Sequence, residues 1–274
     1  MKTIIVPTDF TAVSSNAARY AISLAAQLHT SVTLFHSYPI PMALSEVPTP
    51  PQVFNALQRD AEEFLENAKK DLGLVTPPNV EIKTDARPGT FLTGLQQLCN
   101  ELEPEAIVIS SHGRAGVEHL VMGSETAASV THLRWPLIVV PRGAKFKAPQ
   151  HIAIACDLLK VHSTVPVNMI RKLVETFKAD LSVLHVHNKQ SYSEAVIEGT
   201  GDLQEMLADL HPSYHFIENA DVTEAVLDFV DHHNIDLLIA FPKKHNLLQS
   251  LFRKSESKIM AKETLVPLMT VHEK

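Results

Sequence analysis

The clearest candidates for ligand chemistry in this 274-residue chain are the glycines and the serine that follow a predicted buried strand at Ile107–Ile109. A loop of small residues containing Gly113 comes next, and Gly123-Ser124 then opens a short predicted helix. Glycines let backbone N–H groups approach a phosphate closely, and a helix N-terminus adds unpaired donors and a positive dipole end. The pattern predicts an anion site, although the same glycines could serve only the geometry of a strand-to-helix turn.

A second candidate, Asp9, follows the predicted strand Lys2–Pro7. Ligands of open parallel sheets bind at the carboxyl ends of the strands, so Asp9 is expected at the same edge as the glycines. A carboxylate there can accept hydrogen bonds from a ribose or an adenine, or help hold a metal bound to phosphates. The alternative is a structural cap of the turn or helix that follows.

Alternating strands and helices must position these residues. Further strands are predicted at Val32–Phe35, Val80–Thr84 and Leu137–Val140, helices at Ser14–His29, Gln52–Leu72 and Thr90–Leu102, and a turn at Ala86–Gly89. This βαβ alternation predicts a parallel, doubly wound α/β sheet with right-handed crossovers.

The pattern restarts after a short polar stretch at residues 143–150. The strand His151–Ala155 is followed by Cys156-Asp157, as the first strand is followed by Thr8-Asp9, and the order of elements then repeats. His187 is expected to occupy the place of His36 after the second strand of its copy. The sequence therefore predicts two copies of one domain.

The second copy lacks the glycine loop. An offset of 131 residues places Phe241, Lys244 and Lys254 at the three positions of the glycine motif. Side chains there would fill the space that a phosphate needs. The basic residues of this stretch could form a different anion site, or a solvated charged loop.

These motif residues resemble the universal stress protein family, whose nucleotide-binding members carry Gly-x-x-Gly, nine residues, and Gly-Ser or Gly-Thr after the fourth strand. Ser110 stands here where the family has its first glycine. The resemblance covers nearly the whole chain. It implies two tandem Rossmann-like (adenine nucleotide alpha hydrolase-like) domains at 1–143 and 148–274, each a five-stranded parallel sheet flanked by helices. The domains would pair within the chain through their last strands, Leu137–Val140 and Leu268–Val271, with a homodimer as a further option.

The resemblance also implies an adenine nucleotide, ATP or AMP/ADP with or without Mg²⁺, in the first domain. In the family, the first motif glycine lies near the ribose, and the later glycines and hydroxyl cradle the phosphates. The residues assigned to the nucleotide are Pro7, Thr8, Asp9, Ser37, Ser110, Gly113, Gly123, Ser124 and Glu125.

Composition narrows the class of protein. The net charge of −7 and the absence of a basic run disfavour nucleic acid as a partner. No apolar stretch approaches the roughly 20 residues of a membrane span, and the first residues do not resemble a signal peptide. Cys99 and Cys156 lie far apart in apolar contexts, so we expect buried free thiols and a reducing cytoplasm.

Dedicated catalysis is not expected. The sequence shows no nucleophile paired with a base, and the 15 histidines include no third ligand at a recognisable metal spacing. Slow ATP hydrolysis stays compatible with a binding site. We therefore expect a cytoplasmic stress-response protein that binds ATP or another adenine nucleotide and acts through partners. The alternative is a scaffold or small-molecule sensor of the same fold that binds no nucleotide.

Overall fold

The computed structural model describes residues 2–40, 51–111, 124–187, 193–241 and 266–271. Its strands are β1 (Thr3–Pro7), β2 (Ser31–Tyr38), β3 (Ile82–Pro88), β4 (Ala106–Ser110), β5 (Leu137–Val140), β6 (His151–Ala155), β7 (Asp180–His187), β8 (Ser213–Glu218), β9 (Leu237–Ala240) and β10 (Leu268–Thr270). Its helices are α1 (Ala12–Leu28), α2 (Pro51–Gly73), α3 (Phe91–Leu102), α4 (Ser124–His132), α5 (Val161–Thr164), α6 (Val167–Phe177), α7 (Glu194–Met206) and α8 (Val222–His232), with a 3₁₀ turn at Ala208–Leu210.

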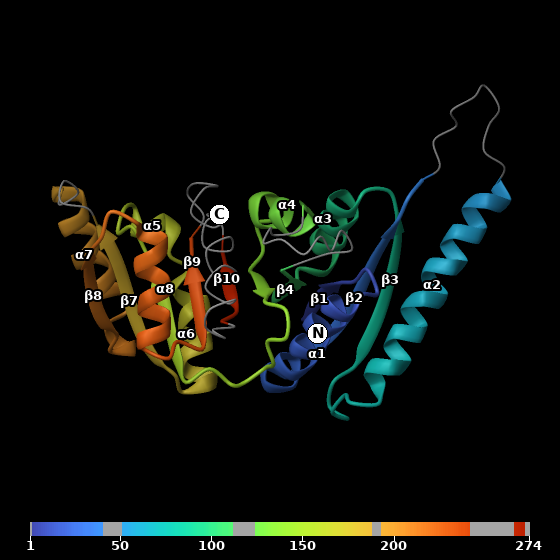
Figure 1. Ribbon diagram of the computed structural model, residues 1–274, viewed down its shortest axis with the longest axis horizontal. Helices are drawn as coiled ribbons and strands as arrows, with labels where there is room; N and C mark the ends of the chain where they lie inside the picture. The colour runs from blue at the N-terminus through green and yellow to red at the C-terminus, as the bar shows by residue number, and fades with distance from the viewer. Residues whose placement is uncertain (1, 41–50, 112–123, 188–192, 242–265, 272–274) are drawn as a thin grey trace, which may run out of the picture.

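The described strands form one sheet in the order β3-β2-β1-β4-β5-β10-β9-β6-β7-β8 (Figure 1). Within β1–β5 and within β6–β10 all neighbours are parallel. The two halves meet at β5 and β10, which pair antiparallel with Leu268 opposite Val139 and Thr270 opposite Leu137. The predicted α/β fold of two Rossmann-like halves is confirmed, while the domain limits at 1–143 and 148–274 stay a prediction.

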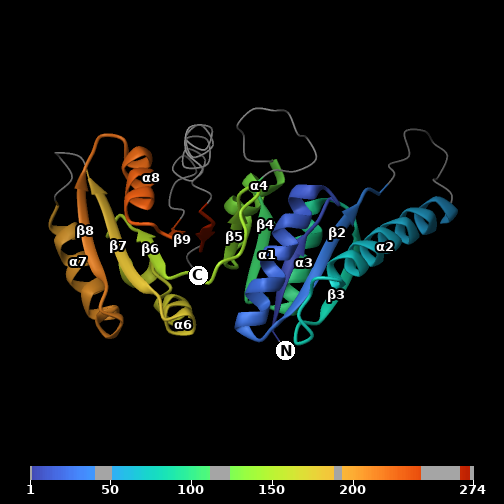
Figure 2. The ribbon, with the colours of Figure 1, turned by 60° about the horizontal axis from the view of Figure 1, so that its bottom comes forward.

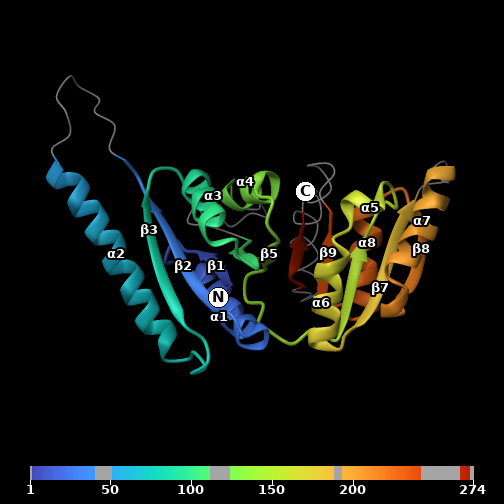
Figure 3. The same ribbon diagram turned by 180° about the vertical axis from the view of Figure 1, so that it is seen from behind.

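Two hydrophobic cores lie on opposite faces of the sheet. Helices α1, α2, α6 and α7 contribute to one core, and α3 and α8 contribute to the other. Figure 2 shows α1 in front of the first half of the sheet and α3 behind it, and Figure 3 shows both halves from behind the view of Figure 1. In β1, Ile4 and Val6 enter the first core and Ile5 enters the second, because side chains alternate along a strand. A strand that is buried on both faces is typical of a parallel sheet.

Side-chain caps set the starts of two helices in the first half. The Thr11 hydroxyl accepts a hydrogen bond from Ser14 N, so α1 begins at Ala12, two residues before the predicted start. Thr90 caps α3 in the same way by accepting from Thr93 N.

The third strand corrects the predicted boundaries. We predicted a strand at Val80–Thr84 and a turn at Ala86–Gly89, but β3 pairs with β2 as far as Pro88, opposite Tyr38. The prediction was wrong because a proline is usually taken to end a strand, and Pro88 was therefore placed in the turn. β3 is the edge strand of the sheet, where a residue without an N–H group costs no ladder hydrogen bond. The chain turns instead at Gly89, whose φ of 113° favours glycine.

The segment between the halves packs against both of them. The Phe146 ring lies 5.2 Å from the Tyr20 ring of α1 and 6.4 Å from the Phe177 ring of α6. Asn16 Nδ2 also donates to the carbonyl of Ala144 at 2.9 Å. These contacts extend the first core from one half into the other.

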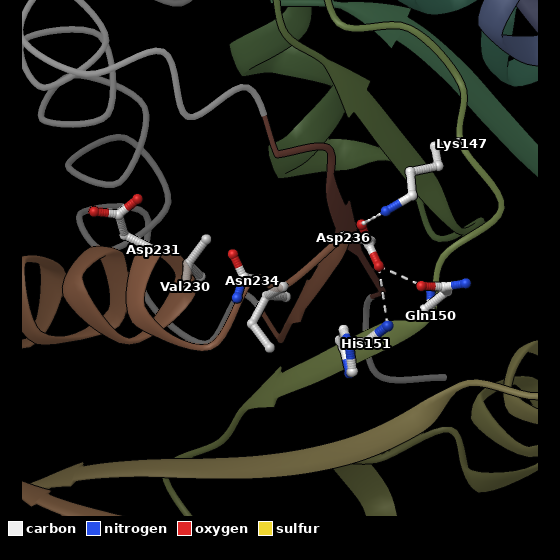
Figure 4. Close-up of a pocket in the computed structure, with 8 residues that line it drawn as sticks. Lys147, Gln150, His151, Val230, Asp231, Asn234 and Asp236 are labelled. Atoms are coloured by element: carbon white, nitrogen blue, oxygen red, sulfur yellow. Dashed lines mark hydrogen bonds and ion pairs between the residues drawn. The ribbon is translucent and has the colours of Figure 1, made fainter.

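Asp236 holds the end of the same segment at the start of β6. Its Oδ2 atom accepts from the backbone N–H groups of Gln150 at 2.8 Å and His151 at 3.1 Å, and its Oδ1 atom lies 3.2 Å from Lys147 Nζ (Figure 4). These groups line a polar hollow of about 420 Å³ together with residues of α8. Desolvation acts to raise the pKa of Asp236, but the two backbone donors and Lys147 outweigh it and hold the pKa below its usual value.

Both cysteines are buried and free, which confirms the expectation from their apolar contexts. Burial raises the pKa of the Cys99 thiol to about 12.

Candidate functional site

Asp9 lies just past β1, and the structure gives hydrogen-bond partners to only one of its two carboxylate oxygens among the described residues. Its Oδ1 atom accepts from the Thr11 backbone N–H at 3.1 Å and from the Thr11 hydroxyl at 2.6 Å. Its Oδ2 atom is buried and has no hydrogen-bond partner among the residues that the structure describes. Desolvation acts to raise the pKa of Asp9, but the hydrogen bonds from Thr11 and the nearby Ser14 hydroxyl outweigh it, so the pKa lies below its usual value. A buried, charged acceptor of this kind suits a ligand that brings a donor.

The loop that carries Asp9 is fixed to β2. Thr8 N donates to the Phe35 carbonyl at 2.9 Å, and the His36 ring nitrogen Nδ1 lies 2.8 Å from the Thr8 carbonyl oxygen. The Thr8 side chain accepts from Phe10 N at 3.0 Å and hydrogen-bonds the Ser14 hydroxyl at 3.2 Å. Phe10 takes a φ of 64°, which turns the chain sharply into α1. The turn that carries the Asp9 carboxylate is therefore held in place by hydrogen bonds to β2 and within the loop itself.

The end of β4 forms the neighbouring side of the site. β4 pairs directly with β1, so Ser110, the last residue of β4, ends at the same edge as Asp9. The Ser110 side chain is buried, and its carbonyl accepts from the Thr126 hydroxyl at 2.9 Å. This bond ties the first turn of α4 to the end of the strand.

Glu125 lies in that first turn of α4. Partial desolvation and, after it, the negative charge of Asp9 raise the pKa of the Glu125 carboxyl. The two residues come from segments more than 100 residues apart in the sequence.

The structure brings the described members of the predicted set to one edge. Pro7 is the buried end of β1, and Ser37 is half-buried near the end of β2. Ser124 is the first residue of α4. Gly113 and Gly123 lie outside the described residues, so their predicted phosphate contacts stay a prediction.

Sequence reasoning missed the group that fixes Asp9. Thr11, Ser14 and His36 were not among the residues predicted to form the site. An aspartate two residues before a threonine, just before a helix, is the pattern of an Asx turn and could have indicated the contact between Asp9 and Thr11.

The second half repeats the backbone of this edge. Cys156 N donates to the Leu184 carbonyl at 3.0 Å, as Thr8 N does to Phe35, and Leu158 takes a φ of 60°, close to that of Phe10. The His185 ring nitrogen Nδ1 lies 3.0 Å from the Cys156 carbonyl oxygen.

His185, and not His187, therefore corresponds to His36, so the predicted equivalence was wrong. The pairing register decides this, because Ser31 lies opposite the first residue of β1 and Asp180 lies opposite the first residue of β6. His36 lies as many residues after Ser31 as His185 lies after Asp180, so the two histidines occupy the same position in their strands.

A close helix contact distinguishes the second half from the first. A Cβ atom at Gly199 of α7 would lie 2.0 Å from the Leu158 backbone oxygen, so this helix lies directly on the loop after β6. In the first half the corresponding loop residue, Phe10, meets α2 through the ring of Phe64 at 5.5 Å. Side chains separate helix and loop in the first half, whereas backbone meets backbone in the second.

Within the described residues, no group of three or more histidine, cysteine, aspartate or glutamate side chains is placed to hold a metal ion. Among the helices of the same residues, none is both long and apolar enough to cross a membrane.

The doubly wound sheet and the polar edge beside β1 and β4 define a Rossmann-like α/β protein with a candidate ligand site in its first half. The sequence model of the universal stress protein family matches residues 1–141, and the chain belongs to that family.

Individual relatives are distant in sequence. Universal stress protein MJ0531 of Methanocaldococcus jannaschii is 23% identical over 146 residues, which cover 53% of this chain and 84% of the relative. The crystal structure of a universal stress protein from Archaeoglobus fulgidus covers 99% of this chain and 96% of its own, with a TM-score of 0.66 and 14% identity. A putative universal stress protein from Pseudomonas aeruginosa covers 100% and 94%, with a TM-score of 0.57 and 10% identity. These similarities show that the fold extends over both halves.

Proposed function

We propose that the first half binds an adenine nucleotide at the carboxyl edge of β1 and β4, and that the protein acts in a cytoplasmic stress response by binding rather than by catalysis. The observation that carries the proposal is the buried Oδ2 atom of Asp9, which has no partner among the described residues. A nucleotide supplies donors for such an atom through its ribose hydroxyls and the adenine amino group.

The neighbouring elements suit the rest of such a ligand. Pro7 ends β1, Thr8 N donates to the Phe35 carbonyl of β2, and Ser37 lies near the end of β2 at the same edge. The N-terminus of α4, held to the Ser110 carbonyl by Thr126, would present the backbone N–H groups of its first turn and a positive dipole end to a phosphate. Mg²⁺ would enter with the phosphates of the nucleotide.

A matched pair of substitutions tests this proposal. Asp9→Asn keeps the shape of the side chain but can place a donor where the buried Oδ2 acceptor now lies. Hydrogen bonds to charged groups contribute about 1.5–3 kcal/mol, so we expect the affinity for ATP, ADP and AMP to fall by about tenfold or more. Asp157→Asn makes the same change at the corresponding position of the second half and should leave binding unchanged.

Isothermal titration calorimetry on the full chain is the direct measurement, with circular dichroism to verify that both variants fold. Equal losses in the two variants, or a wild-type protein that binds none of the three nucleotides at millimolar concentration, would contradict the proposal.

The second candidate function is a scaffold or small-molecule sensor that binds no nucleotide. Ser110 favours it, since a buried side chain stands where nucleotide-binding relatives carry a glycine. Ser110→Gly separates the two functions: a gain of nucleotide binding from a wild type that shows none would support the scaffold.

A further inference from the structure

β8 is an edge strand, and in the described part of the chain no further strand lies on its outer side. On its inner side it pairs with β7, and Asn219 N continues this ladder by donating to the His187 carbonyl at 2.9 Å. Backbone groups alternate in direction along a strand, so the N–H and C=O groups of Tyr214 and Phe216 point away from β7. An edge of this kind is a template for pairing with another strand.

The opposite edge of the sheet, β3, carries protective features that β8 lacks. Pro88 has no N–H group to offer, and Lys83 adds an exposed positive charge. The Thr84 hydroxyl also donates to Glu66 at 2.9 Å, which ties α2 to this strand. β8 has the sequence SYHFIE, with no lysine, arginine or proline. The β8 edge is therefore open to pairing in a way that the β3 edge is not.

An aromatic side chain is exposed in the middle of this open edge. Phe216 is 42% exposed, and its ring centroid lies 6.1 Å from that of the buried His185. Ile197 of α7 is 65% exposed, and Figures 1 and 2 show α7 next to β8 at the same end of the molecule. Apolar side chains beside outward-pointing backbone groups favour burial against another strand.

The sequence of β8 is complementary to itself in an antiparallel arrangement. A two-fold axis at Phe216 brings together two residues whose backbone groups both point outward, so the two copies can exchange hydrogen bonds there. Tyr214 then lies opposite Glu218 of the second copy, and His215 lies opposite Ile217 of that copy. Two aromatic side chains meet at the centre, and no like charges lie opposite one another.

We propose that β8 pairs antiparallel with β8 of a second copy of this chain, so that two chains share one continuous sheet. The ladder runs over Tyr214–Glu218 of each copy, which is longer than the ladder of Leu268–Thr270 that joins the two halves of one chain. A two-fold pairing closes the β8 edge of both copies and leaves β3 at each outer end of the assembly.

Sedimentation velocity of the full chain over a wide range of protein concentration tests this interface. We expect the wild type to form a dimer as the concentration rises. Phe216→Lys removes an aromatic contact from both copies and places two positive charges opposite one another, so the dissociation constant should rise by about tenfold or more. Phe64→Lys is the matched control, because Phe64 is an exposed phenylalanine of α2 in the first half, and it should leave the dimer unchanged. Circular dichroism verifies that both variants fold.

Cysteine substitutions test the register separately. Phe216→Cys places two thiols opposite one another at a distance between paired strands that a disulfide can span, so mild oxidation should give a covalent dimer on a non-reducing gel. Ser213→Cys lies at the start of the same strand, far from Ser213 of the second copy, and should give none. The native Cys99 and Cys156 are both buried and react slowly by comparison.

Three results would overturn the proposal. The first is a wild type that stays monomeric at every concentration, and the second is a dimer that Phe216→Lys leaves as tight as in the wild type. The third is a disulfide-linked dimer from Ser213→Cys with none from Phe216→Cys, which would contradict the antiparallel register.

Discussion

Gly199 is the residue of α7 at which we expect a methyl group to be tolerated least. A Cβ atom added there would lie 2.0 Å from the Leu158 backbone oxygen and 3.0 Å from the Leu158 carbonyl carbon. Leu158 cannot move away cheaply, because its side chain is fully buried and its N–H group is held by the Cys156 sulfur at 3.3 Å. Either α7 must lift from the loop or the backbone of the loop must shift.

The magnitude follows from two opposing effects. Replacing glycine by alanine inside a helix contributes about 1 kcal/mol of stability, and overpacking a tight contact costs about 1–3 kcal/mol, more when backbone atoms must move. We expect Gly199→Ala to lower the free energy of unfolding by about 1–3 kcal/mol overall. Gly201, two residues further along α7, has nothing within 4 Å of an added Cβ atom. Gly201→Ala should therefore raise the free energy of unfolding by up to about 1 kcal/mol.

Urea denaturation followed by far-ultraviolet circular dichroism measures both variants in the full chain. The reasoning predicts shifts of opposite sign, with Gly199→Ala unfolding at lower urea and Gly201→Ala at the wild-type concentration or above. A Gly199→Ala protein as stable as Gly201→Ala would refute the direct contact between α7 and the loop after β6.

Two further predictions concern the segment between the halves and the thiols. The pKa of Asp236 is lower in the folded protein, so the carboxylate stabilises the fold above the unfolded pKa of about 4, and this stabilisation is lost as the pH falls through the folded pKa. In urea denaturation, the difference in unfolding free energy between wild type and Asp236→Asn should therefore shrink from pH 7 to pH 3. A difference that stays constant over this range would contradict the role of the charge. Burial of Cys99 and Cys156 predicts slow reaction with a thiol reagent in the native protein and fast reaction in urea, and rapid labelling of the native protein would show that these cores open readily.

Much of the fold could be predicted because parallel strands and their helices leave strong periodic signals. The alternation of Ile4, Ile5 and Val6 between two cores and the helical spacing of α1 are properties of local sequence. The end of β3 could not be predicted, since Pro88 is acceptable only on an edge strand, and strand order is a property of the whole sheet.

The candidate site divides in the same way. Asp9 and Ser110 could be placed at one edge, because residues that follow parallel strands meet there. The buried state of Asp9 Oδ2 and the raised pKa of Glu125 depend on side-chain positions from distant segments. The correspondence of His36 with His185 depends on pairing register, which a short repeated stretch of weak identity does not determine.

The central claim is that the first half binds an adenine nucleotide, and the most direct measurement is the small-molecule content of the native protein. The full chain is purified without added nucleotide and denatured, and the released compounds are quantified by mass spectrometry, with Asp9→Asn treated identically. The account predicts an adenine nucleotide or nucleoside at close to one per chain in the wild type and a clear loss in Asp9→Asn. A wild-type protein that releases none, and that also fails to bind any when titrated, would contradict it.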